Sequence, residues 1–246
     1  MNKDIRDLSL IEIKPDSSII VDLKYYGKYK NAINKCYVRK EVYERLLKAK
    51  EFLPKGLTFK IWDAYRPMEL QKELYYSYKD KIITEFNLQD LSIDEQNKII
   101  NKYVALPNNC PAHTTGGAID LTLVYSDTLE ELDMGVNFDS FCSLAHTMSY
   151  EKDNMDVNIR NNRRILYDAM TKAGFTNLDS EYWHYDYGNN NWALKTNNNA
   201  IYESIDLNDI EKKIKVYLIF FLLLFLCLIC YLKYHIFDYT LHLLFQ

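Results

Sequence analysis

Two of the five histidines stand beside acidic residues in segments that could hold a metal ion. His113 begins the segment HTTGGAID, which ends at Asp120, and His184 closes the segment EYWH, which begins at Glu181. Zinc hydrolases use three protein ligands, leave one position open for water, and place a carboxylate where it can take a proton from that water. The two segments offer these groups. Their spacing alone is equally compatible with histidines that only form hydrogen bonds or lie on the surface.

The backbone around these segments has to bring the side chains together. The paired glycines of HTTGGAID permit a tight turn before Asp120, because glycine adopts left-handed backbone conformations without steric cost. Glu181 and His184 are three residues apart, and residues at that spacing on a regular strand face opposite sides. We therefore expect Glu181 in the loop that precedes the strand, unless a β-bulge brings the two side chains to one side.

Helices and strands are interleaved up to about residue 204. Apolar residues recur at helical spacing in segments 40–52, 68–80, about 90–104 and 158–175. Runs rich in β-branched and aromatic residues predict strands at 17–27, 57–64, 116–125 and 180–188. The sequence has no glycine-rich phosphate loop, internal repeat or regular βαβ alternation. The pattern therefore predicts an α+β fold, a single domain with a small mixed or antiparallel sheet flanked by helices.

The composition limits the class of protein. Of the 246 residues, 48% are hydrophobic and 26% are charged, as in an ordinary globular protein. A formal net charge of -4, without any Lys/Arg cluster with interleaved aromatics, argues against nucleic acid as a partner. Five scattered cysteines and a polar N-terminal segment predict a reduced, cytoplasmic compartment.

Residues 205–246 differ in composition from the rest of the chain. The segment 216–232 contains no charged residue and is near the lower limit of the roughly 17 to 25 residues that span a bilayer. Lysines flank it and tyrosines lie near its ends, at Lys212, Lys213, Lys215, Tyr217, Tyr231 and Lys233. It predicts a C-terminal transmembrane helix, so the catalytic domain would be tail-anchored to the inner membrane from the cytoplasm. The alternative is a buried or partner-binding helix, which apolar character on all sides disfavours.

Four motifs, which include the two segments above, occur in order along the chain: YRP at 65–67, HTTGGAIDLTL from 113, MGVNFD at 134–139 and EYWHYDYGNNNWA from 181. Together with the VDLKYY segment near Val21, they resemble the D-alanyl-D-alanine dipeptidases, the VanX-type zinc metallopeptidases of peptidase family M15, subfamily D. The resemblance extends to about Tyr202. It implies a dipeptidase domain at residues 1–204 that hydrolyses the small dipeptide D-alanyl-D-alanine to two D-alanines, followed by the tail at 205–246.

The resemblance also implies roles for individual residues at the metal. One Zn²⁺ per chain would be held by His113, Asp120 and His184. Glu181 would act as the general base toward the attacking water and later as the proton donor, which suits a carboxylate beside a metal ion. Arg66, at a strand-to-helix junction, would stabilise the transition state with the fork-like donors of its guanidinium.

At the substrate, the resemblance implies that Asp139 pairs with the free amino terminus and that Tyr25 assists it. The chain departs from the better-known resistance enzymes at Pro111, where those carry a serine two residues before the first zinc histidine. How the substrate carboxylate is bound is therefore open. Two alternatives remain: a D,D- or L,D-carboxypeptidase acting on peptidoglycan-derived peptides, and a non-catalytic, membrane-tethered zinc-binding scaffold.

Overall fold

The computed structural model describes residues 9–14, 18–107, 110–207, 218–225 and 229. The chain divides into two compact units, residues 1–205 and residues 206–246. Every strand among the described residues lies in the first unit.

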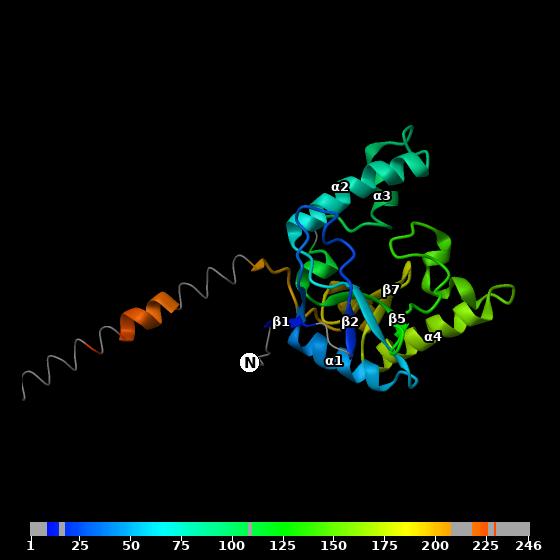
Figure 1. The fold of residues 1–246 in the computed structure, drawn as a ribbon. Helices are drawn as coiled ribbons and strands as arrows, with labels where there is room; N and C mark the ends of the chain where they lie inside the picture. The colour runs from blue at the N-terminus through cyan, green and yellow to red at the C-terminus, as the bar shows by residue number, and fades with distance from the viewer. Residues whose placement is uncertain (1–8, 15–17, 108–109, 208–217, 226–228, 230–246) are drawn as a thin grey trace, which may run out of the picture. The chain divides into compact units, whose positions relative to one another are not determined.

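A five-stranded mixed sheet lies at the centre of the first unit (Figure 1). Its order is β2 (Ile19–Val21), β4 (Leu57–Asp63), β5 (Ala118–Tyr125), β7 (Glu181–Asp186) and β6 (Thr176–Leu178). The pairing of β2 with β4 is parallel, and the other three pairings are antiparallel. This architecture confirms the predicted α+β class with a mixed sheet.

Helices lie on both sides of this sheet. On one side α1 (Lys40–Glu51) and α4 (Val157–Lys172) pack against each other, and α2 (Met68–Glu85) and α3 (Ile93–Ile100) lie on the other (Figure 1). The central strand β5 is buried along its length up to Val124.

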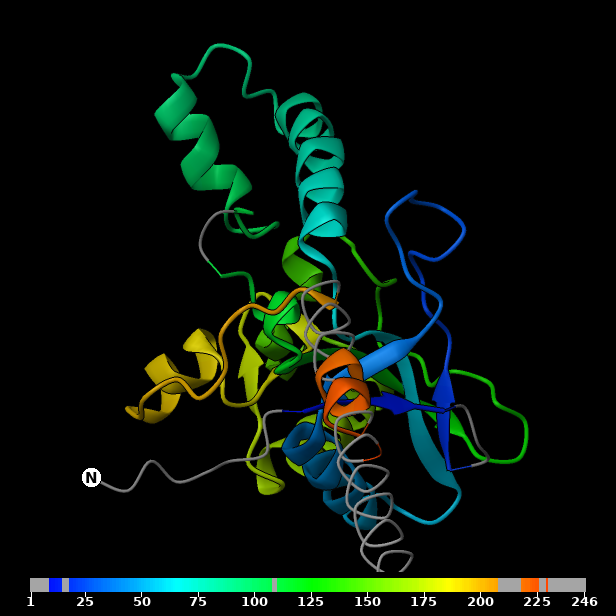
Figure 2. The same ribbon diagram turned by 90° about the vertical axis from the view of Figure 1, so that its left-hand side faces the viewer.

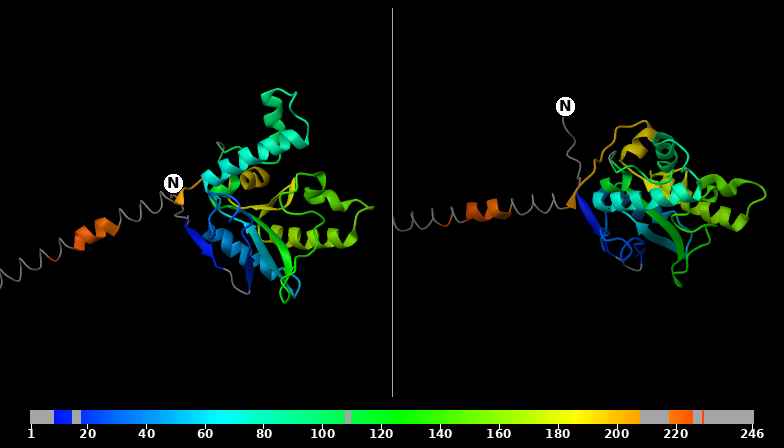
Figure 3. Two further views of the ribbon diagram at one scale, coloured as in Figure 1. Left: turned by 45° about the horizontal axis from the view of Figure 1, so that its top comes forward. Right: turned by 90° about the horizontal axis from the view of Figure 1, so that it is seen from above.

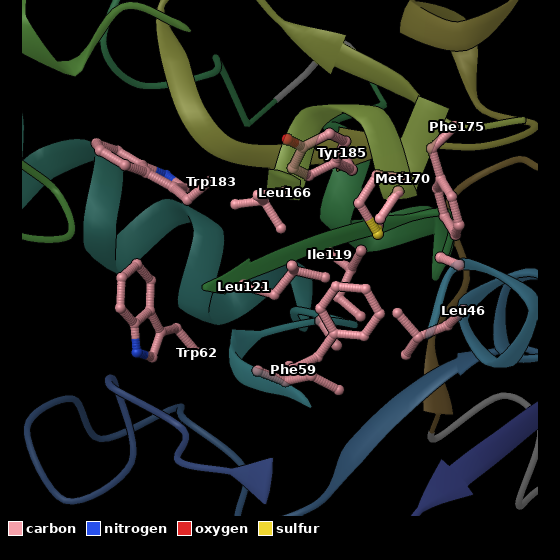
Figure 4. Packing of buried hydrophobic residues seen from close by; sticks show 14 of the residues in the cluster. Leu46, Phe59, Trp62, Ile119, Leu121, Leu166, Met170, Phe175, Trp183 and Tyr185 are labelled. Atoms are coloured by element: carbon pink, nitrogen blue, oxygen red, sulfur yellow. The ribbon is translucent and has the colours of Figure 1, made fainter. Parts of the chain in front are cut away.

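The main core lies between the sheet and the α1–α4 layer (Figure 4). It joins fully buried side chains of two strands and two helices, among them Phe59, Ile119, Leu121, Leu46, Leu166 and Met170. The helical spacing of apolar residues is explained by this packing, although Leu47 of α1 is 37% exposed and lies outside the core. Dense packing of this kind fixes β4 and β5 rigidly, so polar side chains at their ends are held in place.

A second, two-stranded sheet was not expected from the sequence. In it β1 (Leu10–Ile13) pairs antiparallel with β3 (Cys36–Arg39). The strand predicted at 17–27 is correspondingly shorter, because only Ile19–Val21 pairs with β4 and the chain then turns. From β3, Arg39 donates its Nε–H to the carbonyl oxygen of Thr115, 2.6 Å away, and thereby braces the turn after His113.

The helices α2 and α3 form a hairpin that projects from the sheet (Figures 2 and 3). The first is longer than the predicted 68–80, and the second is shorter than the predicted 90–104. The helix α3 begins at Ile93 because Ser92 and Glu95 form a capping box, in which each side chain accepts a hydrogen bond from the other residue's backbone N–H.

In the second unit, residues 218–225 are helical, and their side chains are exposed. None of the helices within the described ranges has both the length and the apolar character needed to cross a membrane. The predicted transmembrane helix at 216–232 therefore has no support in the described part of the tail. The rest of that segment, at 216, 217, 226–228 and 230–232, lies outside the described residues.

Candidate metal centre and substrate cleft

The structure brings His113, Asp120 and His184 together, as the sequence predicts. Asp120 on β5 and His184 on β7 are direct partners in the antiparallel ladder. His113 lies on the short 3-10 helix η1 (Ala112–Thr115), which immediately precedes β5. All three side chains are buried.

The turn between η1 and β5 depends on its glycines. Gly116 has a φ of 72°, in the left-handed region that favours glycine. A Cβ on Gly117 would lie 2.6 Å from the carbonyl oxygen of Tyr187, which is closer than any side chain tolerates. The predicted tight turn is thus confirmed, and substitution at either glycine would displace His113 relative to Asp120.

Hydrogen bonds fix which nitrogen of each histidine faces the cluster. Nδ1 of His113 donates to the carbonyl oxygen of Ala64 at 2.7 Å, and Nε2 of His184 donates to Oδ1 of Asp186 at 2.9 Å. When the imidazole is neutral, as metal binding requires, the other nitrogen carries a lone pair. Nε2 of His113 and Nδ1 of His184 therefore face the cluster as potential metal ligands, each oriented by an acceptor behind it.

The spacing of the three donor groups fits a tetrahedral metal ion. Nε2 of His113 lies 3.2 Å from Nδ1 of His184, and these nitrogens lie 3.3 and 3.0 Å from the two carboxylate oxygens of Asp120. Ligands at zinc-binding distances in a tetrahedral arrangement are about 3.3 Å apart. Two imidazoles and a carboxylate are also a donor set that zinc prefers. The residues present therefore fit a zinc ion in their number, type and spacing.

Glu181 reaches the same centre by way of a bulge. It is the first residue of β7, and not part of the preceding loop, so the expected loop position is wrong. The β6–β7 register shifts between Asn177 and Leu178, and the Nδ2 amide of Asn177 donates to the carbonyl oxygens of Glu181 and His184. This irregularity brings Oε2 of Glu181 within 3.9 Å of Nδ1 of His184.

Burial and charge act in opposite directions on the acidic groups of the centre. Burial alone would raise the pKa of Asp120, but the charges and hydrogen bonds of His113 and His184 hold it below its usual range. Burial raises the pKa of Glu181 to about 8. The negative charges of Asp120 and Asp139 add to this increase, and the charge of His184 opposes it. A bound cation would favour the ionised form of Glu181.

Arg66 lies at the predicted junction, between β4 and α2, and its guanidinium is buried. Its Nε and Nη2 donate to Oδ2 of Asp63 at 2.9 and 2.7 Å, and its Nη1 donates to Oε1 of Gln71 at 2.7 Å. Nη2 also lies 3.9 Å from Oδ2 of Asp120. The guanidinium is thus fixed beside the metal cluster by two residues that the sequence motifs did not single out.

Asp139 and Tyr25 meet, as expected, and a third residue joins them. The hydroxyl of Tyr25 donates to Oδ2 of Asp139 at 2.9 Å, and the hydroxyl of Tyr78 on α2 donates to the same oxygen at 2.8 Å. The Tyr25 ring also lies 5.1 Å from the guanidinium carbon of Arg66. Tyr78 was not predicted as a site residue.

A cleft of about 850 Å³ contains these groups. Its lining includes Arg66, His113, Asp120, Asp139, Glu181 and His184. Pro111 also lines the cleft, and its carbonyl oxygen accepts from the backbone N–H and the hydroxyl of Thr114. The position lacking a serine hydroxyl therefore belongs to the cleft wall.

Comparison with known proteins places the chain among the D-alanyl-D-alanine dipeptidases. The sequence profile described as Peptidase M15, D-ala-D-ala dipeptidase, matches residues 24–203. The D-alanyl-D-alanine dipeptidase of Enterococcus faecium is 32% identical over 169 residues, which cover 62% of this chain and 74% of that protein. The protein of the same name from Escherichia coli strain K12 is 28% identical over 186 residues, 73% of this chain and 83% of that one.

Among solved structures, the vancomycin resistance D,D-dipeptidase VanXYg in complex with a D-Ala-D-Ala phosphinate analog is 21% identical, with a TM-score of 0.38. The match covers 78% of this chain and 73% of the other. A likeness at this level is too low for the two sites to be compared residue by residue.

Proposed function

Because this chain belongs to the D-Ala-D-Ala dipeptidase family of M15 peptidases, we propose that it hydrolyses D-alanyl-D-alanine to two D-alanines with one zinc ion per chain. The observation that carries the proposal is the convergence of two histidine nitrogens and a carboxylate, 3.0 to 3.3 Å apart, with Glu181 beside them. We assign this chemistry to residues 1–204.

The roles of the side chains follow from their positions. When bound, zinc supplies Lewis-acid activation of a water molecule and of the scissile carbonyl. Glu181, next to His184, accepts a proton from the attacking water and later delivers it to the leaving amine. His113, Asp120 and His184, which all line the cleft, would hold the metal.

Arg66 is suited to stabilising the oxyanion. An arginine side chain has five N–H donors. The hydrogen bonds to Asp63 and Gln71 use three of them, one on each nitrogen. Each Nη therefore keeps an N–H that can be donated to the developing negative charge of the substrate, at a position already fixed before substrate arrives.

Asp139 pairs with the ammonium group of the substrate, and this gives a pH dependence. Burial raises the pKa of Asp139 to about 6, while the hydrogen bonds from Tyr78 and Tyr25 oppose the increase. As the pH falls through this value the carboxylate gains a proton and loses its attraction for the ammonium. We expect KM for D-alanyl-D-alanine to rise below about pH 6, measured from pH 5 to 8. Asp139→Asn should have a high KM throughout, without this acid limb; an unchanged limb would contradict the assignment.

Asp186 is expected to strengthen metal binding through His184. Its buried carboxylate accepts from Nε2 of His184, which fixes the ring and increases its basicity. Asp186→Asn keeps the size and an acceptor but removes the charge, so we expect zinc affinity to fall by about 10- to 100-fold in competition with a chelator. Asp168→Asn, on the exposed face of α4, is the matched control and should bind zinc as the wild type does. Equal affinity of both variants would exclude this role.

An assay of D-alanine release distinguishes the proposed activity from its alternatives. The substrates are D-alanyl-D-alanine, longer peptides that end in D-Ala-D-Ala, and L-alanyl-L-alanine, with wild type and Glu181→Ala. Release from the dipeptide alone, lost in Glu181→Ala, supports the proposal. Release from longer peptides supports a carboxypeptidase, the alternative that Pro111 leaves open because the cleft there lacks the serine hydroxyl. No release from any substrate supports the scaffold.

The cytoplasmic location and the membrane contact through residues 205–246 stay predictions. Fractionation of cells that express the full chain tests both, with recovery in the membrane pellet after a high-salt wash as the result expected for a tail anchor. Recovery in the supernatant would exclude the anchor.

A further inference from the structure

A second cavity lies behind the residues that are assigned to the amino end of the substrate. It measures about 740 Å³ and is lined by residues of the β2–β3 loop, of α2 and of the loop after β5. Tyr25, Tyr78 and Asp139 line this cavity, and the same three residues line the catalytic cleft. They therefore form a shared wall between the two spaces.

The wall is assembled from three separate parts of the chain. Tyr25 follows β2, Tyr78 comes from α2, and Asp139 belongs to the loop between β5 and η2 (Ser143–Ala145). The Tyr78 ring packs edge-on against Phe141 at 4.9 Å, and the Tyr25 ring packs against Phe138 at 5.8 Å. The two phenols are thus each supported by a neighbouring ring, and both donate to the carboxylate of Asp139.

The hydrogen bonds distribute unequally over the Asp139 carboxylate. Oδ2 accepts from Tyr78 at 2.8 Å and from Tyr25 at 2.9 Å, whereas Oδ1 is 3.2 Å from the Tyr25 hydroxyl. A carboxylate oxygen has about two lone-pair sites, so Oδ2 is satisfied and Oδ1 keeps acceptor capacity for an ammonium group. The residue is held in this orientation although its φ of 59° is unusual for a non-glycine residue.

We propose that Tyr78 is a specificity-determining residue, whose phenol closes the wall and holds Asp139 so that only substrates with a free amino terminus fit the cleft. The second cavity would receive the additional N-terminal group of a longer or acylated substrate if the wall were opened. This inference rests on the proposed dipeptidase function. Hydrolysis of N-acetyl-D-alanyl-D-alanine consumes one water and yields N-acetyl-D-alanine and D-alanine, so it needs no further reactant.

Two substitutions separate the hydrogen bond from the bulk of the side chain. Tyr78→Phe keeps the wall but removes the donor, so the acid limb of kcat/KM should move to higher pH by about one unit, with no gain on the acetylated substrate. Asp139 is also influenced by Tyr25, Arg66 and Asp120, and it acts in turn on Glu181. The titratable residues Lys24, Lys28, Tyr29 and Lys81 line the second cavity with it. All of them are unchanged in both variants.

Tyr78→Ala should also open the wall, because it removes the bulk of the side chain. We expect kcat/KM for N-acetyl-D-alanyl-D-alanine to rise at least about tenfold over wild type, while kcat/KM for the free dipeptide falls.

Tyr76→Phe is the matched control, because Tyr76 is on the same helix and 62% exposed. Zinc content and the circular dichroism spectrum of each variant establish that it is folded and loaded. Suppose that wild type releases D-alanine from the dipeptide, that Tyr78→Phe keeps the wild-type pH profile and that Tyr78→Ala gains no activity on the acetylated substrate. The proposed role of Tyr78 is then wrong, and the proposed dipeptidase function is retained. If wild type releases no D-alanine, the proposed function itself fails.

Discussion

Replacing Glu181 with glutamine is expected to lower kcat for D-alanyl-D-alanine by about 10³-fold while the protein still binds zinc. Glutamine has nearly the same size and can accept a hydrogen bond, but it cannot take a proton from the attacking water. Glu181 is 3.9 Å from Nδ1 of His184 and is not one of the three residues that converge as ligands. The loss should therefore fall on kcat, with the metal content unchanged.

Steady-state kinetics and metal analysis of the same purified sample measure both quantities. Glu130→Gln, in the exposed turn after β5, is a suitable control because it makes the same chemical change outside the cleft. Full zinc content with an undiminished kcat would rule out Glu181 as the base. Loss of zinc from the Glu181 variant would instead indicate that this carboxylate is needed to hold the metal.

The three candidate metal ligands could be found from the sequence because each stands in a local motif. His113 and Asp120 share one short segment, and His184 lies in another with Glu181. Local spacing could not show that the segments meet, because the contact depends on the ladder in which Asp120 pairs with His184. The resemblance to the family, whose motifs occur in the same order, implied that the two segments meet. The spacing of residues within one segment could not show this.

The supporting residues were missed because they are defined by contacts distant in sequence or by strand periodicity. Asp63 is beside Asp120 across the β4–β5 pair, where the register also shifts. Asp186 is two residues after His184 on the same strand, and period-two alternation could have placed it on the same face. Tyr78 is one of 21 tyrosines, and nothing in its neighbourhood distinguishes it before α2 is placed.

Secondary structure was predicted best where one face of a helix packs on the core. In α1 and α4 the buried residues repeat at helical spacing, and the sequence pattern followed them. The pair β1–β3 was not predicted because each strand has only four residues and their side chains do not alternate regularly between buried and exposed positions. A strand that short is stabilised mainly by its partner, which the sequence does not identify.

Substitution of Arg66 by lysine is expected to lower kcat about 10²-fold without changing the affinity for zinc. Lysine keeps the positive charge beside the buried carboxylate of Asp63 but lacks the fork of donors that can serve Asp63, Gln71 and the substrate together. Because Arg66 is not among the converging ligands, zinc titration should give the wild-type value.

Arg66→Ala is the less informative change, since it would leave Asp63 buried without its cation. Breaking a buried pair from one side typically costs about 3 to 5 kcal/mol, so the variant could lose activity simply by unfolding. Asp63→Asn with Arg66→Ala removes both charges and should recover much of the free energy of unfolding, measured by urea denaturation, but not kcat. If the double variant regains kcat along with stability, Arg66 acts on the fold and not on the transition state.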